Sequence, residues 1–326
     1  MPVVESSYRP PWWLRNAHAQ TVWPALVRKV TAPPWQRERL ELADGDFLDF
    51  DWARNGARRL VVLTHGLEGN SRRTYMVGMA QAFLRRGWDA LAWNFRGCSS
   101  EPNRLCRSYH SGATEDLAAV IAHATRAGAY EQVAVVGFSL GANLTLKFLG
   151  ELGGSPGLVC GGAGISVPCD LQAAAQQMAG PACASYMRRF LRDMGDKMRA
   201  KARQFPGRID LAPLEGMTTF QEFDDAYTAP LHGFRDAEDY WKRCSARQFL
   251  PQIRVPTLIV SALDDPFLAP QCFPYAEAKA SAWVTLDAPA RGGHVGFASL
   301  AAEYWSERRA AEFLTGGAEA ASGAVR

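Results

Sequence analysis

Six short apolar runs alternate with longer amphipathic stretches along most of the chain. The runs span residues 60–64, 90–93, 133–136, 157–160, 256–260 and 283–286, and the stretches that read as helices span roughly residues 73–86, 113–126, 140–151 and 298–313. Continuous apolar runs of this length, separated by helices, are typical of strands that are buried on both faces. The pattern therefore predicts an α/β fold with a mostly parallel central sheet and helices on both faces.

A different pattern precedes the first of these runs. Residues 37–42 and 47–52 alternate in character, and the sequence Asp-Gly-Asp at 44–46 lies between them. Alternating runs on either side of Asp-Gly predict an antiparallel hairpin.

Residues 1–35 are rich in proline and tryptophan, and we expect an irregular N-terminal arm that wraps around the body. Trp12, Trp13 and Trp23 belong to this arm. They could pack on the core or touch lipid, and the sequence leaves both interpretations open.

Residues 170–250 interrupt the alternation of strands and helices. They contain no clear strand, but helix-like pieces occur, including residues 185–205. An insertion of this length is too long for a simple loop. We therefore expect a helical cap at residues 170–250, inserted into an α/β core made of residues 36–169 and 251–326.

The composition is that of a globular protein. The chain has 326 residues, of which 48% are hydrophobic and 21% charged, and this excludes a disordered chain. The net charge of +3 does not indicate a nucleic-acid partner. The seven cysteines include no CxxC pair, which argues against zinc ribbons and thioredoxin-like sites and indicates reduced thiols. The N-terminus has no apolar segment of a signal peptide and no stretch reads as a transmembrane helix, so we expect a cytoplasmic protein with, at most, peripheral membrane contact.

Residues 137–141, with the sequence GFSLG, are the strongest candidate for chemistry because they follow one apolar run and precede a helical stretch. G-x-S-x-G between a strand and a helix is the pattern of a nucleophile elbow, a sharp turn that exposes the serine hydroxyl. Gly137 and Gly141 allow this turn because they carry no Cβ atom. The pattern therefore predicts Ser139 as a nucleophile.

A second match to the same pattern lies at residues 153–157 and contains Ser155. It follows the end of a helix rather than a strand, and Pro156 stands where a backbone N–H is needed. Ser155 is therefore rejected as the nucleophile.

A serine nucleophile needs a base, and the elbow fold orders its triad as serine, acid and histidine along the chain. Of the six histidines, only His232 and His294 follow Ser139. His232 falls inside the expected cap, whereas His294 lies in a glycine-rich loop just after the last apolar run. We therefore predict His294 as the base.

The acid is expected in the loop after the run at 256–260, where Asp264 and Asp265 are adjacent. Two adjacent carboxylates cannot both face one imidazole. Asp265 stands immediately before Pro266, where the chain is forced to extend and turn. This favours Asp265 as the acid, with Asp264 as a structural neighbour.

Backbone N–H groups are expected to bind the oxyanion of the reaction. One is the amide of Leu140, directly after the nucleophile, and the other comes from the loop after the first parallel strand. In that loop Gly66 lets the backbone approach the substrate, and Leu67 supplies the expected second donor. His65 precedes the serine in the chain, so we interpret it as a brace for this loop rather than as the base.

Besides this elbow, the chain contains several further motifs that together are specific to one family. They lie at residues 11–21, 65–69, 96–99, 109–112, 223–240, 264–267 and 293–297. With these residues the chain resembles the YheT-like branch of the α/β-hydrolase superfamily, which is related to the eukaryotic ABHD1/ABHD3-type lipases and esterases. The resemblance runs nearly end to end. It implies a hydrolase with Ser139, Asp265 and His294 as its triad, and activity on carboxylic esters, with acyl lipids or short-chain esters as substrates.

The sequence thus predicts a serine esterase that works through an acyl-enzyme and needs no metal and no organic cofactor. Two alternatives stay open. An acyltransferase would use the same triad to deliver the acyl group to an alcohol or amine. A non-catalytic binding protein would retain only the fold.

Overall fold

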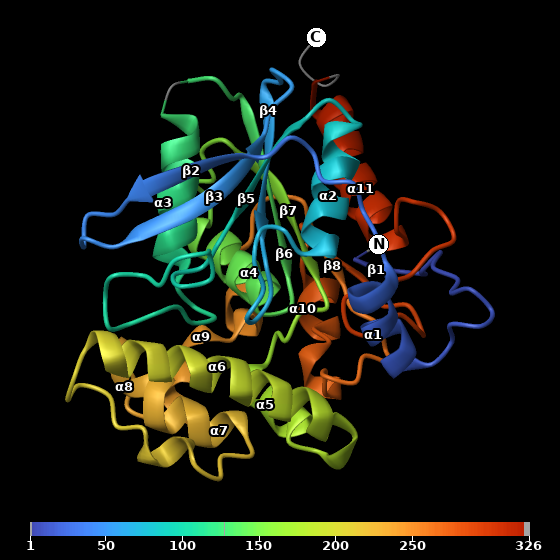
Figure 1. Cartoon of the computed structure of the whole chain (residues 1–326). Helices are drawn as coiled ribbons and strands as arrows, with labels where there is room; N and C mark the ends of the chain where they lie inside the picture. Colours follow the sequence, from blue (N-terminus) through green and yellow to red (C-terminus); the bar gives the residue numbers. More distant parts are fainter. Residues whose placement is uncertain (1, 127, 323–326) are drawn as a thin grey trace.

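The computed structural model describes residues 2–126 and 128–322 (Figure 1). Its strands are β1 (Val3–Val4), β2 (Gln36–Glu41), β3 (Phe47–Ala53), β4 (Arg59–Thr64), β5 (Asp89–Trp93), β6 (Gln132–Phe138), β7 (Val159–Ile165), β8 (Thr257–Val260) and β9 (Val284–Asp287). Its α-helices are α1 (Ala17–Val27), α2 (Thr74–Leu84), α3 (Thr114–Thr125), α4 (Leu140–Leu152), α5 (Leu171–Met178), α6 (Ala184–Gln204), α7 (Phe220–Phe223), α8 (Ala229–His232), α9 (Ala237–Cys244), α10 (Tyr275–Ala280) and α11 (Trp305–Ser322).

These strands form one sheet in the order β1-β9-β8-β7-β6-β4-β5-β3-β2. All pairings are parallel from β1 through β5, and β3 and β2 extend the sheet in antiparallel sense. The predicted hairpin is confirmed, because β2 pairs with β3 from Gln36 opposite Trp52 to Glu41 opposite Phe47. The predicted α/β class with a mostly parallel sheet is confirmed as well.

Helices cover both faces of the sheet (Figure 1). Helices α2 and α11 pack against each other and against the central strands on one face, while α3 and α4 lie on the other. Successive strand residues point to opposite faces, so Leu60 and Val62 join one hydrophobic cluster and Val61 and Leu63 join another. The strands are therefore apolar on both sides, which explains the continuous apolar runs in the sequence.

Two predicted elements are displaced from their observed positions. The strand expected at 157–160 is β7 at Val159–Ile165, where Gly161, Gly162 and Gly164 hide the apolar pattern. The helix expected at 298–313 is α11 at Trp305–Ser322. The residues before α11 form a loop instead. Carbonyl oxygens of this loop accept hydrogen bonds from side chains rather than from helical amides, because Tyr8 donates to Ala298 O at 2.9 Å and Arg28 donates to Ala302 O at 3.1 Å.

The N-terminal arm is more ordered than predicted. The expectation of an irregular segment is wrong, since it contains strand β1, which pairs with β9, and the eleven-residue helix α1. The side chain of Asn16 caps α1 by accepting a hydrogen bond from the amide of Ala19 at 3.0 Å. The arm therefore adds a strand to the edge of the sheet and a helix beside it.

Residues 170–250 form helices α5 to α9 with short 3₁₀ and π segments, and none of them is assigned to a strand. In Figure 1 these helices lie along the lower edge of the sheet, the edge at which β6 leads into α4. This arrangement is compatible with the predicted cap. Within the described part of the chain, no helix is long and apolar enough to span a bilayer.

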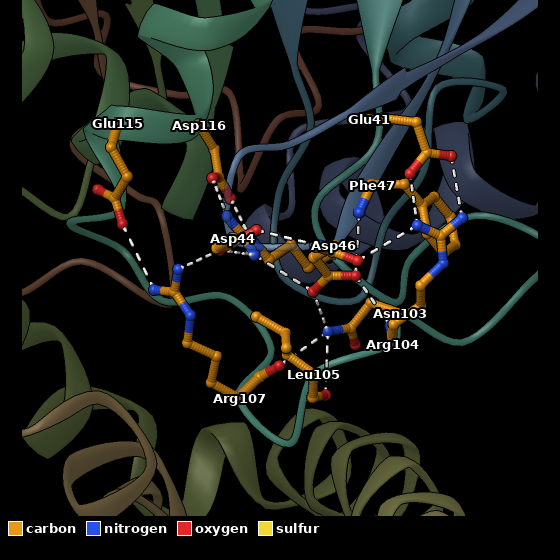
Figure 2. Close-up of polar contacts among 12 residues, drawn as sticks. Glu41, Asp44, Asp46, Phe47, Asn103, Arg104, Leu105, Arg107, Glu115 and Asp116 are labelled. Atoms are coloured by element: carbon orange, nitrogen blue, oxygen red, sulfur yellow. Dashed lines mark hydrogen bonds and ion pairs between the residues drawn. The ribbon is translucent and has the colours of Figure 1, made fainter.

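An ion network centred on the buried Arg96 joins the hairpin to the helical layer (Figure 2). Arg96 donates two hydrogen bonds to Asp116 on α3, at 2.7 and 2.8 Å, and others to Asp44 at 2.7 Å and Asp46 at 3.2 Å. Burial opposes ionisation of Asp44, but hydrogen bonds from Arg96 and Arg107 outweigh it and lower its pKa to about 2. The Asp-Gly-Asp turn thus does more than reverse the chain: it holds Arg96 in place.

The same network orders the loop that follows. Asp46 accepts hydrogen bonds from the side-chain amide of Asn103 at 2.7 Å and from the backbone amide of Arg104 at 2.8 Å (Figure 2). Lys201 of α6 then donates to the carbonyl oxygens of Asn103 and Leu105. The helices of residues 170–250 are therefore anchored on a loop that the hairpin turn fixes.

Candidate active site

The turn between β6 and α4 places Ser139 at the carboxyl edge of the sheet. Ser139 has φ 53°, a left-handed conformation that is strained for a residue with a Cβ atom. A Cβ at Gly137 would collide with the carbonyl oxygen of Gly141, and a Cβ at Gly141 would collide with that of His65. Both glycines are required by this turn, as the elbow pattern predicts.

Ser139, His294 and Asp265 form a continuous chain of hydrogen bonds. The Nε2 atom of His294 lies 2.8 Å from Ser139 Oγ, and its Nδ1 atom lies 2.8 and 3.1 Å from the two carboxylate oxygens of Asp265. A carboxylate only accepts, so Nδ1 carries the proton and Nε2 is free to accept the serine proton. In sequence, His294 lies 29 positions from Asp265 and 155 positions from Ser139, and the fold brings the three residues together.

The surroundings fix this geometry. Asp265 is buried, and its Oδ1 also accepts a hydrogen bond from the amide of Phe267 at 2.9 Å. The ring of Phe267 packs on the imidazole of His294 with 4.2 Å between ring centroids. On the other side, the amide of His294 donates to Thr21 Oγ1 of α1 at 2.9 Å. The histidine loop is therefore held by the arm as well as by the core.

Within the described residues, Asp264 makes no hydrogen bond with the imidazole. Its Oδ1 accepts a hydrogen bond from the amide of Gly293 at 2.9 Å, so it braces the histidine loop. This is the structural part that the sequence assigned to Asp264. The rejected Ser155 lies exposed in a turn after α4, and His232 donates from Nδ1 to Thr228 O at 2.8 Å within the helices of residues 170–250.

The amides of Leu67 and Leu140 are the candidate oxyanion donors. Both residues line the same cavity as Ser139 and His294. Over residues 2–126 and 128–322, no group accepts a hydrogen bond from either amide. Leu140 is also the first residue of α4, and the amides in the first turn of a helix have no partner within the helix and lie where the helix dipole favours negative charge. The two amides are thus available to a ligand.

His65 and Gly66 support this loop. A Cβ at Gly66 would lie 3.2 Å from Ser139 Cβ, so any other residue would crowd the nucleophile at this close approach. His65 donates from Nδ1 to Gly66 O at 2.7 Å and accepts from the amide of Phe95 at 3.1 Å. Burial lowers the pKa of His65 to about 3, which keeps the ring neutral and Nε2 an acceptor.

A cavity of about 150 Å³ adjoins the candidate site. Its wall is mainly apolar and is built largely by α5, α6 and the segment from Phe220 to Thr228. The apolar side chains at this wall include Leu171, Met178, Phe190, Met194, Met198, Phe220, Phe223, Phe267 and Leu268. An apolar cavity that opens onto a nucleophile is suited to the hydrocarbon part of a substrate.

Two features of the cavity wall were missed in the sequence. Lys197 of α6 donates to Glu68 Oε1 at 2.8 Å, and Glu68 directly follows the candidate oxyanion donor Leu67. Asp224 borders the cavity and accepts a hydrogen bond from Trp241 Nε1 at 2.9 Å. The first pair is 129 residues apart, so no local pattern could reveal it.

The chemistry of these parts defines a class of protein. A serine on a strand–turn–helix elbow, with a histidine and an acid on later loops of a parallel sheet, has the architecture of an α/β hydrolase. A family model described as "alpha/beta hydrolase fold" matches residues 59–299. An esterase of Pyrococcus furiosus, Pf2001, has the same fold, with a TM-score of 0.59 and 17% identity over 88% of this chain and 96% of that structure.

Sequence relatives narrow this class. YheT of Escherichia coli K12, which is named an esterase, is 39% identical over 94% of this chain and 92% of its own length. The mouse phospholipase ABHD3 is 27% identical over 91% of this chain and 74% of its own length. The chain belongs to the YheT-like family of α/β hydrolases, as its motifs indicated.

Proposed function

We propose that this chain is a serine hydrolase that cleaves carboxylic esters through an acyl-enzyme. The observation that carries the proposal is the hydrogen-bonded chain from Ser139 through His294 to Asp265. The names of its relatives, which include an esterase and a phospholipase, support the same class of substrate.

In the first half-reaction, Ser139 Oγ attacks the ester carbonyl carbon while its proton moves to His294 Nε2. Asp265 stabilises the imidazolium that forms. The carbonyl oxygen becomes an oxyanion, which the amides of Leu67 and Leu140 bind. The intermediate then expels the alcohol oxygen, which takes the proton from His294, and the acyl group stays on Ser139.

In the second half-reaction, water replaces the alcohol. His294 Nε2 takes a proton from the water as its oxygen attacks the acyl carbon, and the same two amides bind the new oxyanion. The collapse of this intermediate releases the carboxylic acid and returns the proton to Ser139 Oγ. No metal or organic cofactor takes part in this scheme.

The substrate class follows from the cavity. Its apolar wall and its modest volume of about 150 Å³ favour a short or medium acyl chain, and the helices of residues 170–250 act as the cap that sets the length. The cytoplasmic location expected from the sequence stays a prediction.

The test uses 4-nitrophenyl butyrate and a fluorophosphonate probe. We expect the wild-type protein to hydrolyse the ester and to be labelled on Ser139, and we expect Ser139→Ala to lose labelling and at least about 10³-fold in turnover. Ser155→Ala is the matched control, because Ser155 stands in the second G-x-S-x-G sequence and should keep full activity.

Full activity in Ser139→Ala would contradict the proposal, and an unlabelled wild-type protein would favour a binding protein. Added alcohols and amines distinguish hydrolysis from acyl transfer. A hydrolase releases mainly the free acid, whereas an acyltransferase forms the new ester or amide in preference.

A further inference from the structure

Helix α1 turns its apolar side chains outward. Its buried residues are Gln20 and Pro24, whereas Val22, Trp23, Leu26 and Val27 are exposed, Leu26 to 76%. These four positions lie on one side of the helix, because residues one turn apart share a face. A surface helix ordinarily buries its apolar side and presents its polar side to water, so α1 inverts the usual arrangement.

Neighbouring residues extend this apolar surface. Trp12 and Trp13 precede α1, and Trp12 is 79% exposed. The rings of Trp13 and Trp23 are in contact, with centroids 5.0 Å apart. Leu300, 84% exposed, lies in the loop that Arg28 contacts through Ala302 O. We call this surface the arm face, made of Trp12, Trp13, Val22, Trp23, Leu26, Val27 and Leu300.

The arm face is surrounded by positive charge. The sequence has no Asp or Glu between Glu5 and Glu38. Four exposed cations lie on the arm or beside it, and within the described residues none of them forms a salt bridge: Arg9, Arg15, Lys29 and Arg291. Arg291 belongs to the histidine loop and reaches the arm by donating to Arg15 O at 2.8 Å.

The arm is also connected to the candidate active site. Thr21 of α1 accepts a hydrogen bond from the amide of His294 at 2.9 Å. His18, on the first turn of α1, makes a 3.1 Å hydrogen bond with the hydroxyl of Tyr186 on α6, and the two rings are stacked. The arm face therefore belongs to an element that touches both the histidine loop and the helices over the cavity.

We propose that the arm face docks this protein onto the surface of a lipid bilayer that carries anionic headgroups. Tryptophan is the side chain that prefers the boundary between water and hydrocarbon, because its ring is apolar and its N–H is polar. The exposed cations would face the anionic headgroups while the tryptophans and α1 enter the boundary. Docking there would bring the histidine loop and the cavity close to ester groups in the membrane.

The charges favour a bilayer over a second copy of this chain. In a symmetric dimer the same patch occurs on both subunits, so the cations around one arm face would meet those around the other. Like charges across an interface oppose association, whereas an anionic lipid surface attracts every one of them. A neutral bilayer would satisfy the apolar residues only.

The experiment measures sedimentation of the full-length protein with vesicles of phosphatidylcholine that contain 30% phosphatidylglycerol (about one lipid in three, enough for a charged surface). We expect binding at low salt, weaker binding to pure phosphatidylcholine, and a further loss in high salt because ions screen the attraction. Replacement of Arg9, Arg15 or Lys29 by glutamine should weaken vesicle binding by about fivefold for each cation removed.

Tryptophan variants test the apolar part. Trp12→Ser combined with Trp23→Ser should weaken vesicle binding by about tenfold or more, because two large apolar side chains no longer leave water. The matched control is Trp283→Ser, since Trp283 is as exposed as Trp23, at 40%, but lies just before β9. Both the double variant and the control should hydrolyse dissolved 4-nitrophenyl butyrate as the wild type does.

Three outcomes would overturn the proposal: no binding of the wild type to the anionic vesicles, equal loss of binding in Trp283→Ser, or a dimer in light scattering that the Trp12 and Trp23 changes abolish. The last would mean that a second copy covers the arm face. Docking is independent of the proposed reaction, because Ser139→Ala should still bind the vesicles. An inactive protein that binds would therefore contradict the proposed function alone.

Discussion

Asp224 is a carboxyl group enclosed by protein at the wall of the cavity. It accepts a hydrogen bond from Trp241 Nε1 at 2.9 Å, and within the described chain no Lys, Arg or His forms a salt bridge with it. Burial raises its pKa to about 7, although hydrogen bonds from Thr228 and Trp241 oppose the shift. The folded protein therefore keeps a proton on Asp224 under conditions in which the unfolded chain has lost it.

This proton makes the stability of the protein depend on pH. Between about pH 4 and pH 7 the folded state holds one more proton on Asp224 than the unfolded state, so the free energy of unfolding falls as pH rises. Asp224→Asn removes the effect and keeps an oxygen for Trp241. We expect it to stabilise the protein by about 2–4 kcal/mol at pH 8, and by almost nothing at pH 4, in urea unfolding.

Comparing Asp224→Asn with the wild type separates the effect of Asp224 from that of carboxyl groups whose contribution to stability changes with pH in the opposite direction. Asp44, whose pKa is held at about 2, contributes stability that is lost as pH falls, and it is present in both proteins. Asp196→Asn is the control, because Asp196 is exposed and its variant should follow the wild type at every pH. A difference between wild type and Asp224→Asn that stays constant from pH 4 to pH 8 would rule out ionisation as its cause.

Among individual residues, the sequence could predict those whose position follows from the order of the chain and from local turn geometry. Ser139 could be predicted for the candidate site because strand, turn and glycines are neighbours in sequence, and His294 and Asp265 because each follows a predicted strand. Asp224 could not be assigned a role, because its burial depends on Trp241 and on how short helical segments pack. The same limit hid Thr21, which lies 273 residues from the His294 amide that it binds.

Helix α6 is joined to the core by two lysines one turn apart, of which Lys201 is buried and Lys197 half-buried. Lys201 donates to the backbone of the loop at residues 103–105, and Lys197 donates to Glu68 and lies 4.9 Å above the ring of Tyr109. Burial alone would lower the pKa of Lys197, but Cys98 and Glu68 outweigh it and raise the pKa, so the lysine stays charged. Only Lys197 reaches the segment that carries Leu67.

Lys197→Met should therefore act on the reaction through the oxyanion loop. Without its cation, Glu68 loses its ion pair and keeps the hydrogen bond from the Tyr109 hydroxyl at 2.7 Å. The loop is then held less tightly, and we expect the amide of Leu67 to shift relative to the oxyanion. A donor that acts only in the transition state affects kcat and not KM, so we expect kcat to fall by about tenfold, less than the 10²–10³ for complete loss of a donor, while KM changes little. Steady-state kinetics with 4-nitrophenyl butyrate measures both constants.

Lys201→Met separates this effect from loosening of α6 in general. It should lower the midpoint of urea unfolding but leave the kcat of the folded protein unchanged. The double variant Glu68→Gln, Lys197→Met removes both charges and should recover part of the stability that Lys197→Met loses, since no unpaired carboxylate remains. An equal fall of kcat in Lys197→Met and Lys201→Met would show that the loop contact has no special part.

Elements were predictable where their hydrophobic pattern was continuous. The strands β4, β5, β6 and β8 are plain in the sequence because both of their faces are buried. Strand β1 was missed, since two residues carry no periodicity and depend on β9 for their hydrogen bonds. Helix α1 was missed because its apolar residues face outward, so the buried side that would mark a surface helix is absent.

For the molecule as a whole, the sheet and the helices of residues 170–250 contribute different things to the candidate site. The sheet edge supplies the candidate reacting groups, and α5, α6 and α7 supply most of the apolar wall. A substrate that reaches Ser139 must fit between the two, so under the proposed function the cavity of about 150 Å³ would limit the acyl chain. The sequence predicted helices and no clear strand in this segment, but it could not give the size of the space beneath it.

Helix α6 offers a matched pair of methionines to test this limit. Met194 lines the cavity, whereas Met187 lies behind the wall, buried against Cys183 and the wall residues Met178 and Phe267, and does not itself line the cavity. Truncating either to alanine removes the same atoms and should destabilise the fold by about 2–5 kcal/mol. Only Met194→Ala enlarges the space next to the substrate.

We therefore compare kcat/KM for 4-nitrophenyl decanoate with kcat/KM for 4-nitrophenyl butyrate. The ratio of the first to the second should rise by about tenfold in Met194→Ala and stay unchanged in Met187→Ala, since each extra buried CH₂ is worth about 0.8 kcal/mol. If both variants shifted the ratio equally, general loosening of α6 and not the shape of the cavity would select the chain length.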